Sequence, residues 1–148
     1  MPDAQITSEP PSRVERLRVR RDFLFTAGGL AERKRSVVIQ ARIRSDASDV
    51  ASVGFTATKK IGGAVVRNRA KRRLREAANA LLPKYGLAGV NYVFIARQDT
   101  GVRMWSGLLD DVETALISLR RRLLDGETPK PNRRRSARGA SHPQSRKA

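Results

Sequence analysis

The chain has 148 residues, which is room for one compact domain with tails. It carries 31 Lys and Arg against 14 Asp and Glu, a formal charge of +17, so we expect a polyanionic partner and consider nucleic acid first. The lack of cysteine excludes disulfides and thiolate sites, no apolar run is long enough for a membrane helix, and the start lacks a secretory-signal pattern, which together predict a cytoplasmic protein.

Composition divides the chain into three parts. Residues 1–14 are rich in proline and polar side chains without apolar periodicity, and we expect a disordered lead there. Residues 129–148 combine three prolines with seven Lys and Arg and contain no acid. We therefore expect 126–148 to be a disordered basic tail that can attract a polyanion, and we place one RNA-binding domain at 15–125.

Within the domain, the apolar pattern predicts the elements in turn. A short helix at Arg20–Ala27 is ended by Gly28 and Gly29. Strands are predicted at 36–43, 50–58 and 91–97, where β-branched residues alternate or cluster. We expect the first two strands to pair as a hairpin and the third to be more fully buried. With one helix before the third strand and another after it, the fold class is a small single-domain α/β sandwich. It has about three helices on a mixed sheet of three to four strands.

The long helix, expected at 64–82, has two unlike faces. At about 100° per residue, its apolar residues fall on one stripe: Val66, Ala70, Leu74, Ala77, Ala78 and Leu81. The opposite arc holds Asn68, Arg69, Lys71, Arg72, Arg73 and Arg75. The direction of Arg67, at the margin of the stripe, is left open. The helix thus predicts one surface that packs on the sheet and one basic surface that faces outward.

The basic surface continues into the turn before the helix. Between residues 59 and 75 there are eight cations and no acid: Lys59, Lys60, Arg67, Arg69, Lys71, Arg72, Arg73 and Arg75. Like charges at helical spacing repel and cations near a helix start oppose its dipole, each by roughly a few tenths of a kcal/mol. A merely solvated face would intersperse acids, so this run favours a nucleic-acid-binding surface. The turn itself does not match the phosphate loop of an NTPase, so no nucleotide cofactor is implied.

Asn68 interrupts the arginines of this helix. Asparagine is a mediocre helix former because its side chain competes for backbone hydrogen bonds. It either caps a helix that starts late or offers its amide to a base edge or a sugar hydroxyl of an RNA.

The domain lacks an arrangement of side chains suited to catalysis. The only histidine, His142, lies in the expected tail. Asp110, Asp111 and Glu113 come at the start of the last helix and are interpreted as charges that complement its dipole rather than as a metal site. Trp105 is interpreted as an anchor at the start of that helix rather than as a platform for RNA. We assign no catalytic or metal-binding residue to the protein.

The run from Phe55 to Ala77 closely resembles the signature of the bacterial ribonuclease P protein subunit. It contains Lys-Lys-Ile-Gly at 59–62, Arg-Asn-Arg at 67–69 and Arg-Glu-Ala at 75–77. The similarity extends upstream to residues 16–17 and 22–23 and downstream into the last helix, so it covers residues 14–124.

This resemblance implies partners and a reaction. The family protein binds the catalytic RNA of ribonuclease P, an endonuclease that removes the 5′ leader from precursor tRNA, with the chemistry carried by Mg²⁺ held mainly by the RNA. The basic helix would face that RNA, in a left-handed βαβ crossover that departs from the usual rule. The single-stranded leader would lie between the first helix and the sheet, where Phe23 and Gln40 are the candidate contacts. Phe23 and Phe25 are weighed equally as stacking and core residues. The resemblance implies no organic cofactor, membrane or protein oligomer.

Two other functions share some of these features. A structural RNA-binding protein of the ribosomal type, without a role in cleavage, has the same charge and fold class and is kept as the alternative. A DNA-compacting protein fits less well because the basic face lies on a single packed helix without a dimerising repeat.

Overall fold

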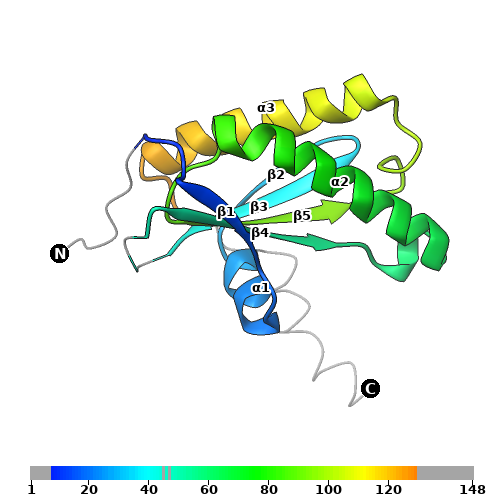
Figure 1. Cartoon of the computed structure of the whole chain (residues 1–148), viewed down its shortest axis with the longest axis horizontal. Helices are drawn as coiled ribbons and strands as arrows, with labels where there is room; N and C mark the ends of the chain where they lie inside the picture. Colours follow the sequence, from blue (N-terminus) through cyan, green and yellow to red (C-terminus); the bar gives the residue numbers. More distant parts are fainter. Residues whose placement is uncertain (1–7, 45, 47, 130–148) are drawn as a thin grey trace, which may run out of the picture.

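The computed structural model describes residues 8–44, 46 and 48–129, and these form one mixed sheet with helices on both sides (Figure 1). In chain order the elements are β1 (Arg13–Arg16), α1 (Arg20–Ala27), β2 (Leu30–Arg33), β3 (Val37–Ile43), β4 (Val50–Thr56), the 3-10 turn η1 (Lys59–Ile61), α2 (Ala64–Tyr85), β5 (Val90–Ala96) and α3 (Trp105–Leu124). The basic tail expected at 126–148 lies outside the described residues from 130 onward.

The sheet has five strands in the order β1-β4-β5-β3-β2. The outer pairs are β1 with β4, parallel, and β2 with β3, antiparallel, while β5 runs parallel to β4 and antiparallel to β3. The expected hairpin between β3 and β4 is therefore wrong, because β5 lies between them. The reason is burial: β5 is buried on both faces, which suits the centre of a sheet, and its parallel pairing with β4 requires the crossover through α2.

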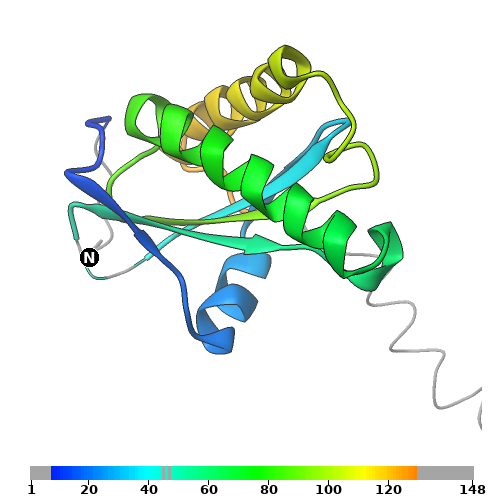
Figure 2. The ribbon, with the colours of Figure 1, turned by 45° about the vertical axis from the view of Figure 1, so that its right-hand side comes forward.

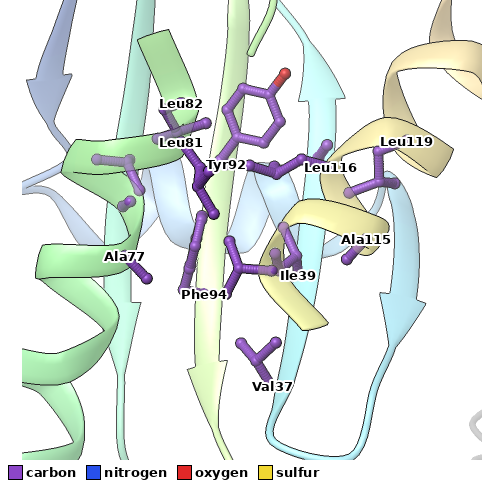
Figure 3. Packing of buried hydrophobic residues seen from close by; sticks show 14 of the residues in the cluster. Val37, Ile39, Ala77, Leu81, Leu82, Tyr92, Phe94, Ala115, Leu116 and Leu119 are labelled. Carbon is purple, nitrogen blue, oxygen red and sulfur yellow. The ribbon is translucent and has the colours of Figure 1, made fainter. Parts of the chain in front are cut away.

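Helices α2 and α3 cover one face of the sheet and α1 lies on the other (Figures 1 and 2). The predicted stripe of α2 is buried from Ala70 onward, whereas Val66 is 43% exposed. The stripe of α3 at Leu108, Val112, Ala115, Leu116, Leu119 and Leu123 is buried throughout. Both stripes belong to one core, and Figure 3 shows Ala77 and Leu81 of α2 and Leu116 and Leu119 of α3 around Tyr92 and Phe94 of β5. The α2 stripe fixes which of its side chains face outward.

Local patterns predict the three helices and the three longer strands but miss the two four-residue strands. The predicted helix α1 has the observed bounds, and α2 continues three residues past the predicted end at Leu82. Strands β1 and β2 were not predicted. Each has four residues, mixes charged with apolar side chains and lies at an edge of the sheet, where pairing with a longer neighbour defines it. Residues 13 and 14 of the expected lead belong to β1.

Candidate RNA interface

The turn before α2 brings two lysines to the helix start. Lys59 and Lys60 are exposed in η1, and Gly62 follows with φ of 144°, a conformation that glycine adopts without strain. Gly63 is the N-cap residue, and it gives the helix no side-chain cap. The first backbone N–H groups of α2 and the two ammonium groups therefore lie in one short stretch, as expected of a surface that binds phosphate.

The basic side chains of α2, with Asn68 among them, lie in three strips rather than on one face. The outer strip, Arg72 with the uncharged Asn68, is exposed. The loop-side pair, Arg69 and Arg73, faces the segment between β5 and α3. The strand-side strip consists of Arg67, Lys71 and Arg75, spaced four residues apart and partly buried. Similar residues on one helix thus have different surroundings.

The loop-side pair is bound by the protein itself. Arg69 Nε donates to the Gly101 carbonyl at 2.9 Å. Arg73 donates from Nη1 to the Thr100 carbonyl at 3.0 Å and from Nη2 to the Arg103 carbonyl. Its guanidinium also lies 5.7 Å from the centre of the Trp105 ring. Burial, with a smaller contribution from the nearby Arg69 charge, lowers the pKa of Arg73 from its ordinary value.

Arg73 was predicted to bind RNA along with the other cations of the helix. In the structure, Arg73 joins α2 to the 100–103 segment by donating to two backbone carbonyls there, and its contact with RNA stays a prediction. Arg69 has a divided role: its Nε is used in the same way, yet the residue remains exposed.

Asp111 holds the same segment from the other side. Its carboxylate pairs with Arg103 at 3.0 Å and accepts a hydrogen bond from Ser36 Oγ at 2.6 Å. Helix α3 begins at Trp105 and has no acid in its first turn, so the dipole interpretation of Asp110, Asp111 and Glu113 is wrong. Asp111 is a structural anchor, and Glu113 accepts a hydrogen bond from the Tyr85 hydroxyl at 2.7 Å.

The strand-side strip meets a cation from β1. The guanidinium carbons of Arg16 and Arg75 lie 5.8 and 6.0 Å from the centre of the Phe55 ring. The Nε atoms of Arg67 and Arg75 are buried without a hydrogen-bond partner among the described residues. Within the same part of the chain, no acid forms an ion pair with either arginine. This flank is an unneutralised cationic surface, and sequence reasoning included its α2 residues but not Arg16.

The predicted leader contacts lie on the opposite face of the sheet, beside α1. Phe23 is partly buried and packs on β4, where a Cβ at Gly54 would overlap its ring. Gln40, at the centre of β3, is partly exposed between Val38 and Arg42 on the α1 side. The Phe25 ring is covered by the Arg42 guanidinium at 4.3 Å. The two phenylalanines therefore pack within the fold, and Gln40 has the more open position.

A cleft of about 610 Å³ lies on this face, lined by Val38, which is two residues before Gln40 on β3, and by its β5 partner Ile95. The cations that line it are Arg33, Arg35, Lys60 and Arg97. Among the described residues, the one acid that lines it is Asp99, which is paired with Arg35 at 2.9 Å. Three of these cations were not predicted as site residues. The sequence marks each of them only as a single basic residue: Arg33 ends β2, Arg35 lies in the following turn and Arg97 directly follows β5. The fold brings these three positions together at one end of the sheet.

The described residues hold no group of three or more His, Cys, Asp and Glu that could bind a metal ion. No helix among them is long and apolar enough to cross a membrane. His142 lies outside this part of the chain.

Comparisons with known proteins agree with the arrangement. The sequence model of the family Ribonuclease P matches residues 12–120. A ribonuclease P protein component of Caulobacter vibrioides is 57% identical over 128 residues, covering 86% of this chain and 84% of that protein. One from Ruegeria pomeroyi is 51% identical over 106 residues, covering 70% and 84%. The solved RNase P protein of Staphylococcus aureus matches with a TM-score of 0.61 at 25% identity over 70% of this chain and 94% of that one. The Thermotoga maritima protein gives 0.60 at 25%, over 70% and 96%.

Proposed function

The chain belongs to the ribonuclease P protein family, and from this we propose how it serves as the protein subunit of that tRNA-processing endoribonuclease. It binds the RNA subunit through the outer and strand-side strips of α2. It binds the 5′ leader of precursor tRNA along the α1 face of the sheet. Family membership favours this function over that of a structural ribosomal protein.

The observation that carries the proposal is the unneutralised charge of α2. In the described chain, the cations of the outer and strand-side strips form no ion pair with an acid. Several cations held close together on one helix raise the free energy of the isolated protein, and RNA phosphates relieve that repulsion. The gain comes mostly from counterion release, so the affinity must fall as salt rises.

The cleft at Val38, two residues from Gln40 along β3, supports leader binding. A single strand exposes its phosphates on one side and its base edges on the other. Arg33, Lys60 and Arg97 are exposed cations at the rim of the cleft, suited to phosphates. Gln40 can donate to and accept from a base edge, as amide side chains do. The bases would lie over the sheet between this cleft and α1.

We assign the chemistry to the RNA subunit. Mg²⁺, when bound there, lowers the pKa of water and stabilises charge on the leaving oxygen. The protein's own residues bind and orient: the α2 cations hold the RNA subunit, and the cleft cations reduce repulsion between that RNA and the leader. The described residues hold no group of three or more His, Cys, Asp and Glu that could bind a metal ion, and we assign the protein the binding of the two RNAs. A cytoplasmic location, where precursor tRNA is processed, stays a prediction.

The test is cleavage of precursor tRNA by RNA-free protein, by the RNA subunit alone and by the two together, over a Mg²⁺ series. We expect no cleavage by the protein alone and a lower Mg²⁺ requirement for the pair than for the RNA. Arg97→Ala should weaken binding of substrates that carry a leader several-fold and leave binding of mature tRNA unchanged. Arg121→Ala, an exposed arginine near the end of α3, is the matched control. Cleavage by RNA-free protein, or an unchanged Mg²⁺ requirement, would contradict the proposal.

A further inference from the structure

The segment between β5 and α3 exposes apolar side chains next to the basic helix. Val102 is 81% exposed, Met104 is 77% exposed and Trp105, the first residue of α3, is 38% exposed. Isolated apolar residues are common on protein surfaces, but three within four positions form a patch. We call these three residues the loop patch.

The backbone beneath the loop patch is held in place. The carbonyls of Thr100, Gly101 and Arg103 accept hydrogen bonds from the loop-side pair of α2. The Arg103 side chain is in turn paired with Asp111. A segment fastened on both sides of Val102 cannot fold its side chains inward to hide them from water. The patch is therefore preorganised for a partner, whose binding would cost little further ordering of the protein.

The charge around the loop patch selects the chemistry of that partner. Arg69 lies beside Gly101, and Arg72 is exposed on the next turn of α2. Val65, 82% exposed, precedes Arg69 by about one turn on the same side of the helix. A ligand that matches this surface has apolar faces and negative charges a few ångströms apart. Unpaired nucleotides have both, a base face and a phosphate, whereas a protein partner would have to bring acids among its apolar side chains.

We propose that the loop patch binds unpaired bases of the RNA subunit, while Arg69 and Arg72 bind the phosphates of the same nucleotides. Base faces pack on Val102 and Met104 and on the open part of the Trp105 ring. Arg73 keeps that ring in position from within the protein. The inference rests on the proposed function, because it adds a nonionic contact to the RNA surface of α2. It also gives Trp105 a role in RNA contact besides that of starting α3.

The test uses Trp105 as its reporter, because it is the only tryptophan of the chain. Titration of the full-length protein with the RNA subunit, and with a short single-stranded RNA, should quench its fluorescence. The double variant Val102→Ser/Met104→Ser should bind the RNA subunit about tenfold more weakly, as expected for lost contacts with one or two bases. The slope of log K against log salt should be unchanged, because no cation is removed.

Two controls separate binding from folding. Ile117→Ser/Leu124→Ser removes apolar side chains that are 45% and 37% exposed elsewhere on α3, and its affinity should stay within twofold of the wild type. The loop variant should fold normally, because the carbonyls that anchor the segment are retained and serine is a favoured N-cap in place of Met104. Thermal unfolding checks this, and Val102→Thr is the milder second variant.

The outcomes of this experiment distinguish the inference from the proposed function. Quenching of Trp105 together with weaker RNA binding by the loop variant supports the inference. Wild-type affinity of the loop variant, or Trp105 fluorescence that RNA does not change, overturns it and leaves the proposed function intact. Failure of the wild-type protein to bind the RNA subunit or to support cleavage would instead overturn the proposed function.

Discussion

Arg72 and Arg73 are neighbours in the sequence and have different roles. Arg72 is exposed, and no hydrogen bond or ion pair joins it to the rest of the described chain. Arg73 is partly buried, donates to two carbonyls and lies against Trp105. Leu74, the next residue, is fully buried in the core. Three consecutive residues thus face solvent, a neighbouring loop and the core, so a charge run on a helix mixes cations available to RNA with cations that the fold itself uses.

The largest expected effect is at the core position of this trio. Leu74→Ala removes a side chain with no exposed surface, and the cavity left behind should lower the free energy of unfolding by about 2–5 kcal/mol. RNA affinity, measured at a temperature where the variant is folded, should stay close to the wild-type value. Urea unfolding followed by circular dichroism checks the first expectation. A loss under about 1 kcal/mol would mean that the site collapses around the gap.

Arg73→Ala should come next. It leaves the carbonyls of Thr100 and Arg103 without their donors, and hydrogen bonds to charged groups contribute about 1.5–3 kcal/mol each. Because the side chain is partly exposed and water can reach the carbonyls, we expect a loss of about 2–3 kcal/mol in unfolding free energy. Arg73→Lys keeps the charge, but its single ammonium cannot bond both carbonyls as the planar guanidinium does. This variant should therefore recover only part of the lost stability. If Arg73→Ala has the unfolding free energy of the wild type, Arg73 does not stabilise the fold, and the distinction between the loop-side pair and the outer strip is contradicted.

The buried face of α2 could be predicted from the sequence, whereas the loop contacts of Arg73 could not. The stripe from Ala70 to Leu81 follows from a 3.6-residue period, which is local, so the buried face of α2 was predictable. The role of Arg73 depends on carbonyls 27 and 30 residues away, and no local pattern marks them. The same applies to the order of the strands, where the hairpin prediction failed because burial on both faces places β5 between β3 and β4.

The cleft on the α1 face was beyond sequence reasoning for a related reason. The cations that line it come from three separate segments, the β2–β3 hairpin with Arg33 and Arg35, η1 with Lys60 and the end of β5 with Arg97, and each is an ordinary surface cation in isolation. Only the sheet topology brings them to one end of the sheet. Gln40 was predicted from the resemblance to the family rather than from a local pattern, and its contact with the leader stays a prediction.

Asn68→Ala should affect RNA binding more than folding. Asn68 is exposed in the first turns of α2, and Gly63 is the N-cap residue, so the interpretation of Asn68 as a cap is wrong. Loss of an amide that bonds RNA should weaken binding by about 1–2 kcal/mol without changing the salt slope, because the side chain is uncharged. Unfolding free energy should stay the same or rise slightly, since alanine is the better helix former. Binding measured across a salt series tests this, and a changed slope would contradict it.

Arg72→Gln should have the smallest effect on stability and still a clear effect on binding. The side chain is exposed and unpaired within the described chain, so the unfolding free energy should change by less than about 0.5 kcal/mol. If Arg72 binds one phosphate, its loss should lower the slope of log K against log salt by roughly 0.7–0.9, with the largest loss of affinity at low salt. Arg121→Gln removes the same charge from the far end of α3 and should leave that slope almost unchanged, since the contribution comes from phosphate contact rather than net charge. Equal slopes for the two variants would mean that the RNA senses only overall charge. In that event the outer strip would have no specific contact with RNA, and the contrast between Arg72 and Arg73 would concern folding alone.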